Sequence, residues 1–326
     1  MSSLSLFAAL LLFAPGSEPA VDASPVPSAF ARVESTQTGS PREGVTFSRL
    51  TVAEADQPAI EAGVWTPAGT AKGPHPMVII SHGNGGDFRS HTDTAQALAG
   101  AGFVVVSLTH TGDNWRDQSR ATDVVGRTRQ LTVIVDFMLE RWEGRTGIDP
   151  ERLGAFGFSA GGFSVLAAAG GNPDLTRVVS HCRDHPDFYD CRLVAQRPRT
   201  GTGIQEAPRL PHDARIKALV VAAPALGFTF TRDGLADVTQ PVQLWQAGSD
   251  QVLPSPFYAE PVRDALPRQA EYIRVDGARH FDFLPPCPAA LAANAPVICA
   301  PTPGFDRAAF HETFNREIVR FFRKHL

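Results

Sequence analysis

The chain has 326 residues, of which 43% are hydrophobic and 20% are charged, and its formal net charge is -4. This is the composition of a globular protein with enough apolar material for one large core or two smaller ones. No basic block of the kind that neutralises nucleic-acid phosphates is present, so we expect no nucleic-acid partner.

The N-terminus carries an apolar run, Ser5 to Ala14, that is too short to span a bilayer comfortably. We interpret residues 1–23 as a signal peptide and expect a secreted or periplasmic protein with no stable membrane span. The first basic residue is Arg32, so a buried amphipathic arm or a misassigned start codon is the alternative. Residues 24–44 are rich in Pro, Ser, Ala and Gly, which predicts a flexible arm.

From about Val45 onward, short β-branched runs alternate with longer helical patterns. This alternation predicts an α/β fold, with parallel strands joined by helical crossovers in one domain over residues 45–326. The predicted strands are Met77–Ser81, Phe103–Leu108, Arg152–Phe158, Ile216–Ala222, Pro241–Gln246 and Glu271–Val275. The predicted helices are His91–Ala101, Gly126–Glu143, Ala160–Ala169 and one from about Asp306 with Phe310, Phe314, Ile318 and Phe321 on one face.

A stretch rich in proline and charge interrupts the alternation at about residues 171–214. A connection of that length inside a compact domain is uncommon unless it covers a binding site or carries short helices, so we predict a cap-like insertion. His181, His185 and His212 lie in or beside this stretch, and we expect them at the surface or in the cap.

Four cysteines form two close pairs, Cys182 with Cys191 and Cys287 with Cys299. Such pairs predict disulfides that staple irregular loops in an oxidising compartment, and reduced thiols are the alternative. Neither pair is a CxxC and the neighbouring histidines complete no familiar zinc pattern, so no metal is expected.

The motif Gly157-Phe158-Ser159-Ala160-Gly161 is a GxSxG between a predicted strand and a predicted helix. This is the context of a nucleophile elbow, where a tight turn presents the serine hydroxyl at a helix N-terminus. We therefore assign Ser159 as the candidate nucleophile. A glycine-rich turn without a catalytic role is the alternative.

A serine hydroxyl needs a positioned base, and that base needs a third group to hold its tautomer. Asp250 follows the predicted strand that ends at Gln246, and His280 follows the last predicted strand, which gives the order Ser, Asp, His. Asp237 is the alternative acid, because Asp276 and Asp282 flank the histidine too closely. His82 and His110 precede the nucleophile and are expected to be structural or to face substrate.

Acyl transfer also needs backbone amides that meet the developing oxyanion. We predict the amide of Ala160 as one donor and that of Asn84, in the glycine-rich loop Ser81 to Gly86, as the other. A turn that only starts the next helix is the alternative for this loop. As candidate substrate contacts we take His82, Phe158 and Phe281. Phenylalanines near strand ends, which also include Phe163, Phe228, Phe230 and Phe283, predict an apolar acyl pocket, although core packing is expected for at least half of them.

Four segments together, SHGNGG, GFSAGG, AGSDQVLP and GARHFDFL, resemble the predicted dienelactone hydrolases close to platelet-activating-factor acetylhydrolases, over about Val45 to the C-terminus. The resemblance implies an α/β-hydrolase fold and ester hydrolysis without metal or cofactor. It places the family's nucleophile on Ser159, its acid on Asp250, its histidine on His280 and its oxyanion loop on residues 82–84. True dienelactone hydrolases carry cysteine where Ser159 stands, and serine indicates ordinary ester chemistry.

We therefore expect a serine esterase for a small, apolar ester with a short or medium acyl chain. An amidase or peptidase on the same three residues, or a phospholipid or polyester hydrolase, is the alternative within enzymes. A secreted binding protein that keeps the fold without catalysis is the alternative outside them.

Overall fold

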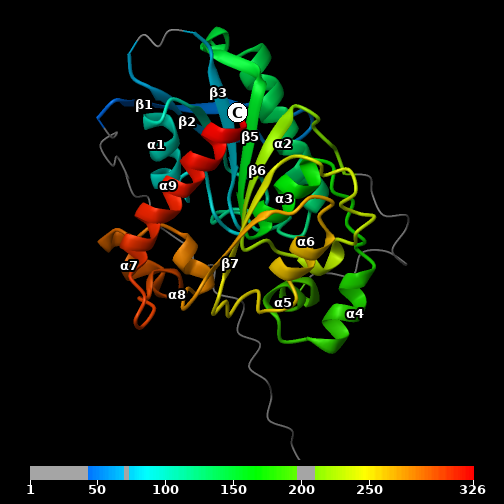
Figure 1. Cartoon of the computed structure of the whole chain (residues 1–326). Helices are drawn as coiled ribbons and strands as arrows, with labels where there is room; N and C mark the ends of the chain where they lie inside the picture. Colours follow the sequence, from blue (N-terminus) through cyan, green and yellow to red (C-terminus); the bar gives the residue numbers. More distant parts are fainter. Residues whose placement is uncertain (1–42, 70–72, 197–209) are drawn as a thin grey trace, which may run out of the picture.

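The computed structural model describes residues 43–69, 73–196 and 210–326. The predicted signal peptide, residues 1–23, and nearly all of the predicted arm lie outside the described residues. Within them, one central sheet carries helices on both faces (Figure 1). The strands are β1 Val45–Val52, β2 Ile60–Pro67, β3 His75–Ser81, β4 Val104–Leu108, β5 Ile148–Phe158, β6 Ile216–Ala222, β7 Val242–Ala247 and β8 Glu271–Val275. The helices are α1 Thr92–Gly100, α2 Val124–Glu140, α3 Ala160–Ala168, α4 Arg177–Asp184, α5 Tyr189–Ala195, α6 Ala259–Ala265, α7 Ala289–Asn294, α8 Pro296–Cys299 and α9 Arg307–His325, with 3-10 turns η1 Arg145–Gly147, η2 Gly227–Thr229 and η3 His280–Phe283.

The strands lie in the order β1-β2-β4-β3-β5-β6-β7-β8. Strands β3 to β8 run parallel to one another, whereas β1 and β2 form an antiparallel pair and β2 runs antiparallel to β4. This arrangement confirms the predicted α/β-hydrolase fold. The sequence did not predict β1 and β2, because the middle of β1 is largely exposed and lacks a continuous apolar run.

Two apolar cores form on opposite faces of the sheet, because successive side chains of a strand point to opposite sides. In β3, Met77 and Ile79 belong to one core, while Val78 and Ile80 belong to the other. Parallel strands covered on both faces read as nearly continuous apolar runs, which explains why the sequence located them well.

Helices α2, α3 and α6 cover the first face and α1 with α9 covers the second (Figure 1). The predicted apolar face of α9 buries Phe314, Ile318 and Phe321. Its first turn is capped by Asp306, whose side chain accepts a hydrogen bond from the Ala309 amide at 3.0 Å. A capped amphipathic helix of this length is stabilised chiefly by its packed face.

The described part of the insertion contains α4 and α5, which the Cys182–Cys191 disulfide joins. A second disulfide, Cys287–Cys299, ties the segment after η3 to the end of α8. Both predicted disulfides are thus present. None of the described helices combines the length and the apolar character needed to cross a bilayer.

Candidate active site

Three predicted site residues come together at the carboxyl edge of the sheet. Ser159 directly follows β5, Asp250 follows β7, and His280 begins η3 after β8. The carboxyl ends of neighbouring parallel strands meet at one edge, which is where α/β folds bind their ligands. The strand order therefore brings together residues that are 121 positions apart in the chain.

Ser159 occupies a sharp turn with a φ angle of 55° and a ψ angle of -119°. A positive φ in a residue other than glycine is costly and persists only when the surroundings enforce it. Its amide donates to Ala222 O at 2.9 Å, and its carbonyl accepts from Phe163 N at 3.2 Å and Ala225 N at 3.0 Å. A Cβ atom on Gly161 would overlap the Ser81 carbonyl, so this glycine is required by close backbone contact.

His280 lies between the other two side chains. Its Nδ1 is 2.8 Å from Asp250 Oδ2, and its Nε2 is 3.1 Å from Ser159 Oγ. The second carboxylate oxygen of Asp250 accepts from the amides of Val252 and Leu253 at 2.9 and 2.7 Å. An acceptor at Nδ1 holds the proton on that nitrogen and leaves Nε2 free to accept the serine proton.

The rival carboxylates have other partners. Asp282 is buried and pairs with Arg307 at 2.9 Å, while Asp276 is exposed and pairs with Arg274. Asp237 is exposed and does not reach the histidine. The structure therefore brings Asp250, and none of the three alternatives, into contact with His280 Nδ1.

The two predicted oxyanion donors flank the nucleophile. Ala160 begins α3, and Asn84 lies in the loop that follows β3. This loop is close to the serine, because a Cβ on Gly83 would lie 3.3 Å from Ser159 Cβ. Among the described residues, neither the backbone N–H of Ala160 nor that of Asn84 has a protein acceptor. Two such N–H groups beside a nucleophile can donate hydrogen bonds to an oxyanion of the substrate.

The three predicted substrate contacts differ in position. His82 is completely buried, with its ring Nδ1 2.6 Å from Gly83 O and its Nε2 accepting from His110 N at 3.0 Å. Burial and the nearby Arg127 guanidinium lower the pKa of His82 well below its usual range. We therefore regard His82 as a support of the loop, since it presents no surface to a substrate.

The two aromatic candidates lie on the histidine. The Phe158 ring is 4.8 Å from the His280 ring, centroid to centroid, but the side chain is buried. Phe281 is half-buried, with its ring 5.4 Å from the same imidazole. Of the predicted phenylalanines, Phe163 and Phe230 pack together in the first core, so they do not line a pocket.

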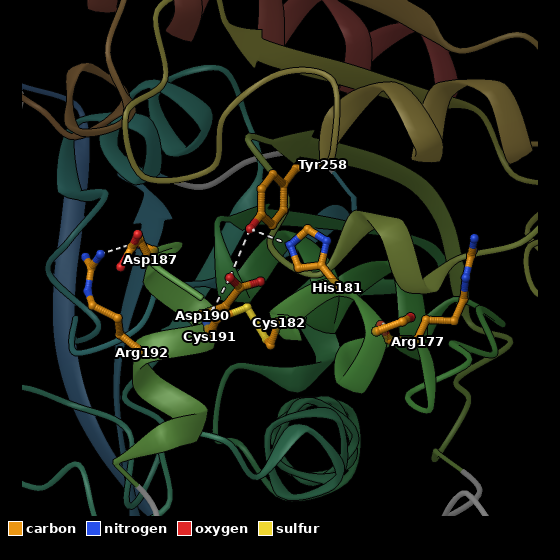
Figure 2. Close-up of a disulfide and its surroundings, with 9 residues drawn as sticks. Arg177, His181, Cys182, Asp187, Asp190, Cys191, Arg192 and Tyr258 are labelled. Atoms are coloured by element: carbon orange, nitrogen blue, oxygen red, sulfur yellow. Dashed lines mark hydrogen bonds between the residues drawn. A yellow bond between two sulfur atoms is a disulfide. The ribbon is translucent and has the colours of Figure 1, made fainter. Parts of the chain in front are cut away.

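The insertion contributes a polar group that the sequence did not reveal (Figure 2). Tyr258 Oη donates to Asp190 Oδ1 at 2.9 Å and lies 3.3 Å from His181 Nε2. His181 lies on α4 of the cap-like insertion, and its ring is buried and stacks on Phe228 with centroids 3.7 Å apart. His181, Asp190 and Cys191 have ligand atoms close to one another, but this sulfur is bonded to Cys182 and is no thiolate ligand.

Sequence reasoning also missed Asp113 and Arg127, a buried ion pair beneath the loop that carries Asn84. A signal for Arg127 existed, because it is a charged residue among the apolar positions of a long helix. Its partner follows β4 in an irregular segment, and nothing in the local pattern links the two residues.

One comparison with known proteins bears on this site. A family model described as the Dienelactone hydrolase family matches residues 60–200. The match runs from β2 through α5 and includes Ser159, whereas Asp250 and His280 lie beyond it.

Proposed function

We propose that this chain, a member of the α/β-hydrolase superfamily, hydrolyses carboxylic esters through an acyl-enzyme on Ser159. The observation that carries the proposal is the unbroken contact from Asp250 through His280 to Ser159. Beside it lie two backbone amides that have no protein acceptor within the described part of the chain. A hydrogen-bonded acid, base and nucleophile next to oxyanion donors is the arrangement that acyl transfer requires.

In the first half-reaction, His280 Nε2 takes the Ser159 hydroxyl proton while Oγ bonds to the ester carbonyl carbon. The carbonyl oxygen becomes an oxyanion that accepts hydrogen bonds from the Asn84 and Ala160 amides. Asp250 stabilises the imidazolium without taking its proton. The imidazolium then protonates the leaving alcohol as the ester bond breaks, which leaves an acyl group on Oγ.

In the second half-reaction, water occupies the place of the alcohol. His280 Nε2 takes a proton from the water, whose oxygen attacks the acyl carbon, and a second oxyanion forms against the same amides. The bond from the acyl carbon to Oγ then breaks, and the proton held on Nε2 returns to the serine. The products are a carboxylic acid and an alcohol.

We propose an apolar substrate with a short or medium acyl chain. Support comes from the aromatic cluster of the cap and adjoining loops, which includes Phe188, Phe228, Phe257 and Tyr258. It lies where α4 meets η2 and the loop after β7. It includes residues whose backbone amides donate hydrogen bonds to Ser159 and to Asp250. An apolar cap over a site restricts both water and large substrates.

We also propose that the protein is exported to the periplasm or beyond. Both disulfides are compatible with an oxidising compartment, which is where such bonds persist.

The proposed function is tested with p-nitrophenyl esters from acetate to palmitate and with the corresponding anilides, using the parent protein and Ser159→Ala. We expect hydrolysis of the shorter esters that the variant loses. Equal rates in both proteins would refute the assignment of Ser159 as the nucleophile. Faster cleavage of the anilides than of the esters would identify an amidase. A preference for the palmitate ester would refute the expected acyl chain length.

A further inference from the structure

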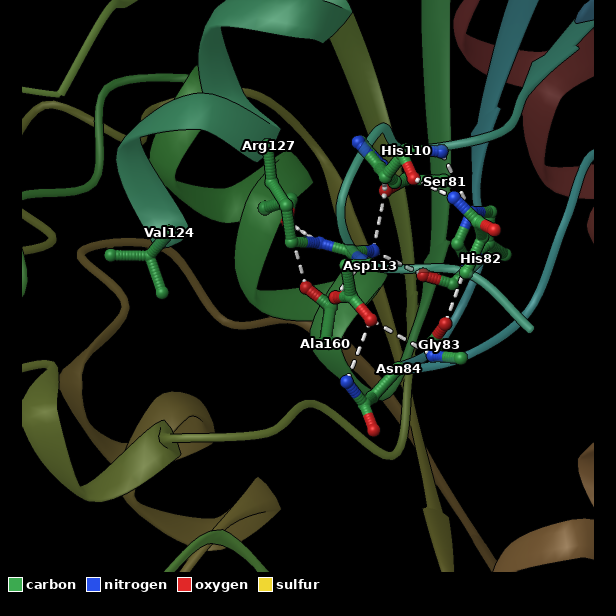
Figure 3. Close-up of polar contacts among 12 residues, drawn as sticks. Ser81, His82, Gly83, Asn84, His110, Asp113, Val124, Arg127 and Ala160 are labelled. Atoms are coloured by element: carbon green, nitrogen blue, oxygen red, sulfur yellow. Dashed lines mark hydrogen bonds and ion pairs between the residues drawn. The ribbon is translucent and has the colours of Figure 1, made fainter. Parts of the chain in front are cut away.

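A buried ion pair lies under the proposed oxyanion hole (Figure 3). Arg127 of α2 and Asp113, which follows β4, have side chains that are 3% and 1% exposed, with Nη1 2.5 Å from Oδ2. Removing two charges from water is expensive unless each also makes further hydrogen bonds. The further bonds of both residues lead to the segments that carry the two oxyanion donors.

Asp113 anchors the residue that carries the loop donor through two hydrogen bonds. Its Oδ1 accepts from the side-chain amide of Asn84 at 2.6 Å and from the backbone amide of Gly85 at 2.9 Å. Both anchored groups directly follow the backbone N–H of Asn84 in the chain. The carboxylate therefore restricts the position of that N–H, although it does not contact it.

Arg127 connects the same loop to the helix donor. Its Nη2 donates to His82 O, and its Nε donates to Ser164 Oγ at 3.1 Å. The Ser164 hydroxyl in turn donates to Ala160 O at 2.8 Å. The planar guanidinium has donors in a fixed fork, so a single side chain can set the spacing between the loop and the first turn of α3.

The insertion reaches the same loop through Tyr189. Its hydroxyl donates to Asn84 Oδ1 at 2.5 Å, and burial raises the pKa of Tyr189 to about 12, so it remains a donor at neutral pH. Tyr189 is two residues from Cys191, which the disulfide joins to α4. The cap and the ion pair thus hold opposite ends of one side-chain amide.

We infer that Asp113 and Arg127 are positioning residues that set the distance and direction of both oxyanion donors, and that Tyr189 couples the cap to the donor of Asn84. This inference rests on the proposed function. It explains why a charged pair is buried at this place, where apolar side chains would pack without an electrostatic cost.

The test compares Asp113→Asn, Arg127→Lys, Asn84→Ala and Tyr189→Phe with the parent protein. Asp213→Asn is the matched control, because Asp213 is also a buried carboxylate paired with an arginine, Arg215, but precedes β6 at the opposite edge of the sheet. Each protein is assayed for ester hydrolysis, thermal unfolding and inhibition by an alkyl trifluoromethyl ketone. This ketone bonds to the serine oxygen and places an oxyanion where the substrate would.

We expect kcat to fall by about 10- to 100-fold in Asp113→Asn and Arg127→Lys, which is less than the loss of a whole donor, and KM to change by less than about 3-fold. The ketone inhibition constant should rise by the same factor as kcat/KM falls. Asn84→Ala and Tyr189→Phe leave the ion pair in place, so they should fold normally and show smaller losses of the same kind. Asp213→Asn should lower only stability.

If Ser159→Ala abolishes the ester hydrolysis of the parent protein, the proposed function stands. If the folded variants of residues 84, 113, 127 and 189 then retain the parent kcat and ketone affinity, the positioning role is refuted alone. A fall in kcat without a matching loss of ketone affinity would refute it as well. Hydrolysis that survives Ser159→Ala would instead refute the proposed function, and the inference with it.

Discussion

Asp250 Oδ2 lies 2.8 Å from His280 Nδ1, and the two side chains are 3% and 2% exposed. The carboxylate is itself fixed by two backbone amides, so the imidazole has one favoured orientation and one favoured tautomer. This relationship is the basis of the proposed mechanism, because Nε2 can accept a proton from Ser159 only if Nδ1 carries the ring hydrogen.

The contact with Asp250 predicts a large effect of an isosteric change. In Asp250→Asn the side-chain amide can donate to Nδ1 and favour the wrong tautomer, so kcat for a short ester should fall by about 10³- to 10⁴-fold with little change in KM. Steady-state kinetics measure this. Asp237→Asn, at an exposed aspartate that the sequence left as an alternative, should keep the parent rate. Equal losses in the two variants would contradict the assignment.

The elbow predicts a strong backbone requirement at Gly161. In Gly161→Ala the new methyl group overlaps the Ser81 carbonyl, so strand and helix must separate and the free energy of unfolding should fall by about 3 kcal/mol or more. Gly147→Ala is the matched control, because nothing lies within 4 Å of a Cβ at that glycine. Urea unfolding of both proteins distinguishes them, and similar stabilities would contradict the close contact.

His91 predicts a loss of stability in acid. Its ring is buried edge-on against Phe156 and Phe158, and neither ring nitrogen has a partner among the described residues. Burial lowers the pKa of His91 from 6.5 to about 4, an effect that His311 adds to and Asp93 opposes.

The neutral ring therefore contributes stability above pH 6.5, which is lost as the pH falls to about 4. The shift corresponds to about 3 kcal/mol. His91→Leu should remove this part of the acid sensitivity without lowering stability at pH 7.5. Denaturant unfolding at pH 7.5 and 4.5 measures both effects. His212→Leu, at an exposed histidine, is the control. An unchanged acid dependence in His91→Leu would contradict the prediction.

The cap disulfide predicts a combined loss of stability and activity. Replacing Cys182 and Cys191 by serine opens a closed loop with a sequence separation of 9, which should lower the free energy of unfolding of the cap by about 2 to 3 kcal/mol. It should also lower kcat/KM, because the freed helix carries Tyr189. Replacing Cys287 and Cys299 by serine should lower the free energy of unfolding by a similar amount but reduce kcat/KM less. The reverse order of activities would contradict the coupling.

The sequence predicted most of the sheet and the residues that meet in the candidate site. The predicted bounds of β6 and β8 agree with the structure. For β6 the reason is that a buried parallel strand leaves a nearly continuous apolar run. The sequence also indicated Ser159, Asp250 and His280, because each follows a strand at the same edge of the sheet. It could not indicate that Asp113 pairs with Arg127, since that contact depends on how α2 packs against β3 and α3.

Two other features also could not be predicted from the sequence. The antiparallel strand β1 escaped prediction because solvent-exposed side chains dominate its middle. The sequence placed His181 at the surface or in the cap, but it could not indicate that packing of α4 on η2 puts this ring against Phe228. Both outcomes are set by tertiary packing rather than by local pattern.

The central claim, an acyl group carried on Ser159, is tested most directly by stopping the reaction with acid during hydrolysis of p-nitrophenyl butyrate and mapping the adduct by mass spectrometry. We predict a butyryl group on the peptide that contains Ser159, its accumulation in the parent protein, and its absence from Ser159→Ala. Turnover without any adduct on that peptide, or with the acyl group on another residue, would contradict the mechanism.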